Sequence, residues 1–389
     1  MAALAVLAGT FNYFRPIEPV PAVRSVAGLQ RIDGSPPILP WPAGGSAAVG
    51  AAEIGLVADS GQTTPLPIAS VAKAMTALVV VEAQPLESGA TGPSTAVTQA
   101  DVDLYNAEKA EQSTVPVVTG EQLNERQLLE GLLIPSANNF ADILARSLAP
   151  TPEAFVAMLN ARAAALGMTH THFADASGFN AQTASTPPDL IKLAAEFLAH
   201  PVLVEIASMA DTRLPVAGTV YNVDYALGKS GIFGIKTGSS GAAGACFLFA
   251  ARQPVGGGTA VVIGAVLGLP TLELAFRASQ RLIEAAAPAF RRAPIDLAGQ
   301  KVAAYRAPWG SQAAIVPSRD LVLLTWPGLL LHRRLVVPAA SPPLAAGADA
   351  GTLTAWVGEG SRQTVPLVTA DGFYPPGKGW RITRIAGTA

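Results

Sequence analysis

The segment Ser70–Ala83, SVAKAMTALVVVEA, constrains the fold more than any other part of the chain, because it is apolar on almost every face. Pro65 and Pro67 stop the chain just before it, and a helix that is apolar all round must be buried. Lys73 lies inside this apolar run, where a lysine needs a partner or a role. The sequence therefore predicts a central buried helix that carries one lysine.

Strand-like and helical patterns surround this helix. The run Ala47–Ala58 predicts a buried strand, and the apolar runs Gly241–Arg252 and Thr259–Gly268, joined by a Gly-rich turn, predict a β-hairpin. Residues 101–200 have helical periodicity, and Asn124 is expected to cap one of the helices. These elements predict an α/β sandwich with a separate helical lobe.

The composition divides the chain into four parts. Residues 1–14 form an apolar N-terminal segment, shorter than the roughly 20 residues of a membrane-spanning helix. It is either an ordinary apolar terminus or part of a truncated export signal or anchor, and we favour the second. Residues 15–45 are Pro-rich and predict a linker, residues 46–290 form the main α/β domain, and residues 291–389, with short strand-like runs between Gly and Pro, predict a small all-β C-terminal domain.

The composition also excludes several classes of protein. Half the chain is hydrophobic and 14% is charged, which excludes a disordered protein, and a net charge of −2 without like-charge runs argues against nucleic-acid binding. The single cysteine, Cys246, excludes an internal disulfide framework and is expected in the core. His170, His172 and Asp175 share one loop but are too few ligands for a metal, so we expect no metal site.

Three short motifs occur in a fixed order along the chain. Ser70 and Lys73 form S-x-x-K, Ser136 and Asn138 form S-x-N, and Lys236-Thr237-Gly238 forms K-T-G at the start of the predicted hairpin. On a helix, residues at i and i+3 share a face, so the amine of Lys73 can reach the hydroxyl of Ser70. The combination predicts a nucleophilic serine activated by an amine.

Each motif by itself has a simpler structural explanation. Ser70 could cap the helix while Lys73 faces solvent, the S-x-N motif could cap the following helix, and Lys236 could protect the edge of a sheet. Such short patterns arise by chance in a chain of this length. The joint occurrence of the three motifs, each in a demanding context, favours the functional interpretation.

With these motifs the chain resembles the serine DD-peptidases and penicillin-binding proteins, in particular the low-molecular-mass D-alanyl-D-alanine carboxypeptidases. The resemblance covers roughly Ala47–Ala287 and is carried by PIASVAKAMTALVV, GEQLNERQLLEGLLIPSANNFADILA, ALGMTHTHFADASGFN and GIKTGSSGAAGACFLFAA. It implies a penicillin-binding-protein/β-lactamase-like fold, with an antiparallel five-stranded sheet flanked by helices plus a helical lobe. Residues 46–290 are then the catalytic DD-peptidase domain.

The resemblance also implies a role for each motif residue. Ser70 is the expected nucleophile, with Lys73 as the neutral base, and Ser136 and Asn138 are the remaining catalytic residues. The expected substrate-binding residues, which hold the terminal carboxylate or line its strand, are Lys236, Thr237, Gly238 and Ser239. Backbone N–H groups of Ser70 and Ser239 would form the oxyanion hole.

The expected function is that of a serine DD-carboxypeptidase, without a cofactor, that removes the terminal D-alanine from peptidoglycan pentapeptide stems and is inhibited by β-lactams. The alternatives are a β-lactamase, a DD-endopeptidase, and a non-catalytic wall-binding scaffold. Ala137 within the S-x-N motif and the absence of a glutamate in ALGMTHTHFADASGFN argue against the lactamase. The substrate implies an extracytoplasmic location, with a peripheral or N-terminal membrane association left open.

Overall fold

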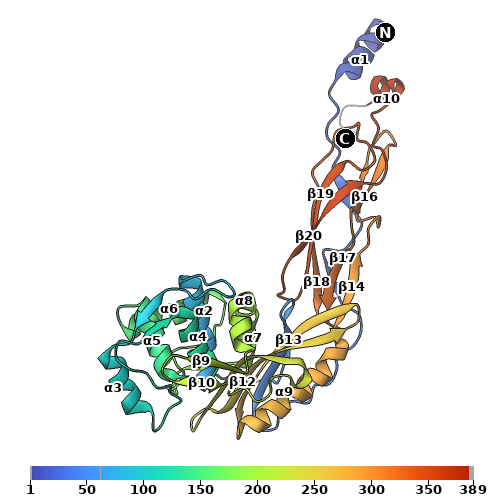
Figure 1. Cartoon of the computed structure of the whole chain (residues 1–389). Helices are drawn as coiled ribbons and strands as arrows, with labels where there is room; N and C mark the ends of the chain where they lie inside the picture. Colours follow the sequence, from blue (N-terminus) through green and yellow to red (C-terminus); the bar gives the residue numbers. More distant parts are fainter. Residues whose placement is uncertain (1, 62, 385–389) are drawn as a thin grey trace. The chain divides into compact units, whose positions relative to one another are not determined.

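The computed structural model describes residues 2–61 and 63–384 of the chain. These residues form two compact units (Figure 1). We call Ser35–Arg291 the main unit, and the segments up to Gly34 and from Arg292 onward together the terminal unit.

A five-stranded antiparallel sheet lies at the centre of the main unit, as predicted. The predicted single strand at Ala47–Ala58 is wrong, because the run folds back on itself as a hairpin. Gly55, with a φ of 81°, adopts the left-handed conformation that this reversal requires. The strand order is β11-β12-β13-β3-β4, with bounds β3 Ser46–Ala51, β4 Gly55–Asp59, β11 Ile232–Ser240, β12 Gly244–Val255 and β13 Gly258–Leu269.

Helices cover both faces of this sheet. Leu248 of β12 joins the core on the side of α7 (Pro187–Phe197), which contacts β3 and β13. The next residue back, Phe247, points to the other face and packs edge-on against Phe276 of α9 (Leu272–Ala286), with ring centroids 5.0 Å apart. Alternate residues of a strand point to opposite faces, so both sets of side chains of β12 are buried.

The predicted central helix is confirmed as the core of the helical lobe. Helix α2 spans Lys73–Ala83, and every residue from Lys73 to Val81 is buried. It contacts α4, α5, α6 and α7. Asn124 caps α4 as predicted, accepting a hydrogen bond from the backbone N–H of Gln127 at 2.9 Å. The other lobe helices are α3 Gln99–Glu108, α4 Glu125–Leu133, α5 Asn138–Leu148, α6 Pro152–Ala165 and α8 Pro201–Ala207.

Short elements complete the main unit. Three are 3-10 turns, namely η1 Ala69–Ala72, η2 Lys229–Gly231 and η3 Ala287–Ala289. Six short strands form two-stranded pairs, namely β5 Leu66–Pro67 with β8 Ala184–Ser185, β6 Ser94–Ala96 with β7 Gln122–Asn124, and β9 Asp211–Leu214 with β10 Gly218–Tyr221.

The terminal unit is built on a seven-stranded sheet of order β1-β15-β16-β20-β19-β18-β2. Residues 15–45, predicted to be a linker, supply both edge strands of this sheet, β1 (Ala22–Arg24) and β2 (Leu29–Arg31). Three-residue edge strands are compatible with the prolines around them, because an edge strand leaves one row of N–H groups unpaired. The other strands of this sheet are β15 Ala303–Arg306, β16 Gln312–Pro317, β18 Leu330–Val336, β19 Asp349–Val357 and β20 Gln363–Thr369. Strands β14 (Arg291–Asp296) and β17 (Leu321–Thr325) pair with each other in a separate two-stranded sheet.

Two helices also belong to the terminal unit. Helix α1 (Ala2–Phe14) contacts α10 (Lys378–Thr383), although the two are far apart in the sequence (Figure 1). Within the part of the chain that the structure describes, no helix has the length and apolar character needed to cross a membrane.

Candidate functional site

Ser70 and Lys73 lie where the 3-10 turn η1 passes into helix α2. Ala69 opens this turn with a φ of 46°, and Ser70 is partly exposed while Lys73 is fully buried. The Nζ atom of Lys73 lies 2.7 Å from the Oγ atom of Ser70. The side chain of Ser70 does not cap the turn, whose N-cap residue Ile68 makes no side-chain cap bond. The capping alternative for this serine is therefore wrong, as is the solvent-facing position for the lysine.

Three polar groups surround the amine of Lys73. Besides Ser70, Nζ contacts Oδ1 of Asn138 at 2.5 Å and the carbonyl oxygen of Ser177 at 3.2 Å. A neutral amine has two N–H donors and one lone pair. The two donors suffice for Asn138 and Ser177, and the lone pair can then accept the hydroxyl proton of Ser70.

The electrostatic surroundings favour this neutral form. Burial lowers the pKa of Lys73 well below its usual value, and the second buried amine, Lys236, lowers it further. The carboxylates of Asp175, Asp142 and Glu108 act in the opposite direction with smaller effects. Desolvation prevails, so the surroundings of Lys73 favour its free base far more than water would.

Ser136 lies in the turn between α4 and α5, Asn138 is the first residue of α5, and both are buried. Ser136 has a φ of 66°, a conformation seldom adopted by serine. Neither residue caps α5, whose N-cap is Ala137 without a side-chain bond. The capping alternative for the S-x-N motif is therefore wrong, and Asn138 instead directs its side-chain carbonyl at Lys73.

The K-T-G motif lies in β11, the edge strand of the main sheet, which runs directly along the 3-10 turn that carries Ser70. A β-carbon added to Gly238 would lie 2.8 Å from the backbone nitrogen of Ser70 and 2.9 Å from the carbonyl oxygen of Ile68. Only glycine allows this close approach of two backbones. Ser239 follows at an exposed position of the same strand.

Lys236 and Thr237 are buried, so Lys236 is not an exposed lysine that protects the sheet edge. The Nζ atom of Lys236 donates to the carbonyl oxygen of Thr237 at 3.1 Å. Burial lowers the pKa of Lys236 to about 7, against a smaller opposing effect of Asp224. The structure thus brings all eight residues singled out from the sequence into one region, around η1, β11 and the α4–α5 turn.

One contributor was missed at the sequence level. The loop that presents the carbonyl of Ser177 to Lys73 is organised by Asp175, whose carboxylate accepts from Ser177 Oγ at 2.8 Å, Phe179 N at 2.8 Å and Thr183 Oγ1 at 2.5 Å. The sequence DASGF contains the Asx-type turn signal of this loop, but nothing in it indicates contact with Lys73.

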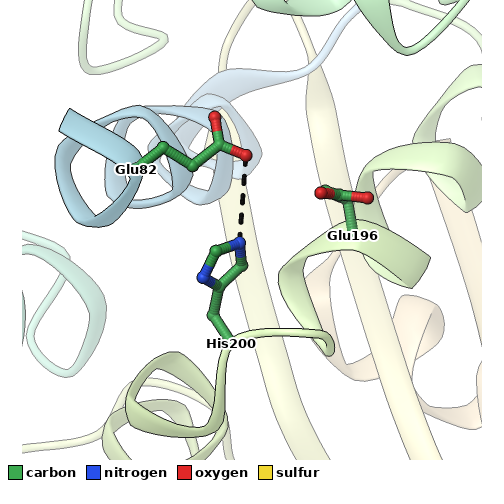
Figure 2. Close-up of side chains that lie close together, drawn as sticks. All are labelled: Glu82, Glu196 and His200. Atoms are coloured by element: carbon green, nitrogen blue, oxygen red, sulfur yellow. Dashed lines mark ion pairs between the residues drawn. The ribbon is translucent and has the colours of Figure 1, made fainter. Parts of the chain in front are cut away.

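Away from this site, Glu82, Glu196 and His200 cluster closely enough to suggest a metal site (Figure 2). The guanidinium of Arg162 contacts Glu82 at 2.6 Å and Glu196 at 2.7 Å, and His200 lies 3.8 Å from Glu82. Because Arg162 already supplies the positive charge between the two carboxylates, the cluster is explained as an ion-pair network.

The other sequence candidates lie outside the reactive region. Cys246 is fully buried in β12, and burial raises the pKa of its thiol to about 11, which confirms its assignment to the core. His172 pairs through its backbone with Ala184, which gives the loop containing His170 a structural function.

Known proteins support this assignment at the family level. The family described as D-alanyl-D-alanine carboxypeptidase matches residues 48–267, more than half of the chain. A D-alanyl-D-alanine carboxypeptidase of Mycobacterium tuberculosis is 33% identical over 221 residues, covering 55% of this chain and 71% of that protein. A D-alanyl-D-alanine endopeptidase of Escherichia coli is 26% identical over 190 residues, covering 47% of this chain and 58% of that protein.

Solved structures agree with the fold. The crystal structure of a Streptomyces DD-transpeptidase, 25% identical, covers 65% of this chain with a TM-score of 0.56, and 99% of that chain is matched. A peptidoglycan synthesis regulatory factor from Streptococcus pneumoniae is 21% identical, and the match covers 84% of this chain and 98% of that one. Its TM-score of 0.65 shows similarity of fold. These matches confirm the penicillin-binding-protein-like fold. The chain belongs to the D-alanyl-D-alanine carboxypeptidase family of serine peptidases, as its three motifs predicted.

Proposed function

We propose that this chain removes the terminal D-alanine from peptidoglycan pentapeptide stems through an acyl-enzyme on Ser70. The observation that carries the proposal is the 2.7 Å contact between Ser70 Oγ and the buried amine of Lys73, whose pKa is lowered by its surroundings. A buried neutral amine next to a partly exposed hydroxyl is a general base next to its nucleophile.

Acylation follows from this contact. Lys73 accepts the hydroxyl proton of Ser70 while Oγ attacks the carbonyl carbon of the penultimate D-alanine. The developing oxyanion is stabilised by the backbone N–H groups of Ser70 and Ser239, which belong to the closely packed η1 and β11. Ser136, in the turn just before Asn138, relays a proton to the nitrogen of the leaving D-alanine, and the amide bond breaks. Water then hydrolyses the ester.

The K-T-G strand supplies substrate binding. Because β11 is the edge strand of its sheet, a peptide can add alongside it by backbone hydrogen bonding. Lys236 and Thr237 then hold the terminal carboxylate of the substrate, and this negative charge favours the protonated form of Lys236. A requirement for a free carboxylate is the expected mark of a carboxypeptidase.

The β-lactamase alternative differs in what happens after acylation. A β-lactamase needs a base that activates water against the acyl ester. The nearest loop offers Asp175, which is already engaged by Ser177, Phe179 and Thr183. We therefore expect slow deacylation of β-lactams and hence inhibition by them. DD-endopeptidase activity stays open, since the related E. coli protein has that name and both reactions cleave the same kind of bond.

Intact-protein mass spectrometry after incubation with benzylpenicillin tests this proposal. We expect a stable adduct in the wild type, none in Ser70→Ala, and release of D-alanine from a diacetyl-Lys-D-Ala-D-Ala peptide by the wild type alone. Rapid penicillin turnover without an accumulating adduct would favour the β-lactamase. A wild type without adduct and without D-alanine release would favour a non-catalytic scaffold.

We propose an extracytoplasmic location, where the stem peptides are, with membrane association through the terminal unit. Helix α1 exposes Leu7, Phe11 and Phe14, and Arg15 follows directly. Apolar side chains beside arginine suit the membrane interface. Co-sedimentation with anionic phospholipid vesicles should be lost in a Phe11→Ser/Phe14→Ser variant, and unchanged binding would contradict this proposal.

A further inference from the structure

The segment 109–118, between α3 and β7, is attached closely to the first turn of α5, which begins at Asn138. The backbone N–H of Asn138 donates to the carbonyl oxygen of Ser113 at 2.7 Å. The amide of Asn139 bonds both backbone groups of Val115, accepting from N at 3.1 Å and donating to O at 2.9 Å. The segment is therefore held in place by bonds that do not involve the side chain of Gln112.

Gln112 adds a contact of a different kind, because it binds the side chain of Asn138. The Nδ2 atom of Asn138 donates to Oε1 of Gln112. The N–H donors of the Gln112 amide remain for the carboxylate of Glu108, whose pKa the Gln112 side chain lowers by hydrogen bonding. The second oxygen of that carboxylate is buried without a partner.

These contacts give the hydrogen bonds a single direction. Burial raises the pKa of Glu108, while Gln112 and Lys73 act to lower it. In its ionised form this carboxylate can only accept, so it requires the N–H side of the Gln112 amide, and the carbonyl of Gln112 then requires the N–H side of the Asn138 amide. The carbonyl of Asn138 is left to face Lys73, as observed at 2.5 Å. A flipped Asn138 would direct N–H donors at the amine and compete for its lone pair.

We propose that Glu108 and Gln112 are positioning residues, which fix the orientation of the Asn138 amide and so reserve the lone pair of Lys73 for the hydroxyl of Ser70. Neither residue needs to touch the substrate for this effect. The inference rests on the proposed function, since the lone pair matters only if Lys73 is the base for Ser70. It adds two residues that lie outside the three motifs.

The test measures the rate constant for acylation by benzylpenicillin in two single variants and one exchanged pair. Gln112→Met keeps the length of the side chain without its hydrogen bonds. Glu108→Gln replaces the carboxylate, which can only accept hydrogen bonds, with an amide that can also donate. Each should lower the rate about tenfold, the effect of one lost hydrogen bond, with KM for the peptide substrate changed less than about twofold. The double variant Glu108→Gln/Gln112→Glu restores an acceptor-only group next to Asn138 and should recover most of the rate.

Recovery of the acylation rate in the double variant would show that these residues act by orienting the Asn138 amide and not only by packing. Glu111→Gln, an exposed neighbour, is the matched control and should acylate at the wild-type rate. Wild-type rates in Gln112→Met, or a double variant as slow as the single variants at equal thermal stability, would overturn the inference. Absence of an adduct in the wild type itself would overturn the proposed function, and this inference with it.

Discussion

Replacing Gly238 with alanine should separate two segments that must stay together for acylation. The added β-carbon would lie 2.8 Å from Ser70 N, 2.9 Å from Val71 N and 2.9 Å from Ile68 O, all backbone atoms that no rotamer change can move. Ordinary contact begins near 3.4 Å, so β11 and the Ser70 turn must move apart by about 0.6 Å.

This displacement acts on both stability and rate. Overpacking of this kind costs about 2 kcal/mol of folding stability. The larger effect is on catalysis, because Ser70 and Ser239 supply the two oxyanion donors from the two separated segments. A misplacement of about 1 Å costs roughly a hundredfold in rate, so we expect acylation by benzylpenicillin to fall by at least about tenfold.

The matched control is Gly241→Ala, three residues along the chain, where a β-carbon meets nothing within 4 Å. Stopped-flow acylation by a chromogenic β-lactam, with the melting temperature measured in parallel, distinguishes the two variants. If Gly238→Ala acylates as fast as Gly241→Ala, the close packing of the K-T-G strand against the nucleophile is not required, and the reasoning fails.

Three further predictions use the charged groups of the main unit. Lys236→Ala should raise KM at least about tenfold for a peptide with a free C-terminal carboxylate but little for the same peptide with a C-terminal amide, because only the carboxylate binds the amine of Lys236. Equal effects on both peptides would contradict this. In the wild type, KM for the free acid should rise above about pH 7 as Lys236, with a pKa of about 7, loses its proton, and a flat KM between pH 6 and 9 would refute this. Glu125 is buried with neither carboxylate oxygen hydrogen-bonded, and burial raises its pKa to about 7. A raised carboxyl pKa favours folding below the unfolded value, and this contribution is lost as the pH rises through about 7. Thermal melts should therefore show Glu125→Gln more stable than the wild type by ~2 kcal/mol at pH 8 and equal to it at pH 4, and equal stability at both would refute the assignment.

The central helix could be predicted because its pattern lies within one segment, and the site around it because three motifs occur together. The apolar run Ser70–Ala83 has only one stable environment, the interior, and Lys73 within it needs a function. The three motifs are individually weak, and the eight site residues were predicted from the resemblance that the motifs carry together. Only the structure shows why position 238 must be glycine, since the sequence does not say which backbone this residue approaches.

Other features depend on contacts between distant segments, which leave no local pattern. Ser177 contributes a backbone carbonyl, which any residue could supply, and Gln112 lies 26 residues from Asn138 in a segment without periodicity. The Pro-rich stretch 15–45 was predicted to be a linker, and its strands β1 and β2 were missed. Each has only three residues and depends on a partner strand from the C-terminal part of the chain. The break at Gly55 was also missed, because a continuous apolar run fits one buried strand as well as two.

The ionisation of Lys73 itself tests the account most directly. NMR titration of protein labelled with ¹³C and ¹⁵N at lysine, with the resonance assigned by its absence in Lys73→Arg, would report the pKa of this amine in the free enzyme. We predict a value far below the usual 10.5, with the amine largely neutral at the pH where penicillin acylates Ser70. An amine that stays protonated up to pH 9 while acylation proceeds at full rate would contradict its role as the base.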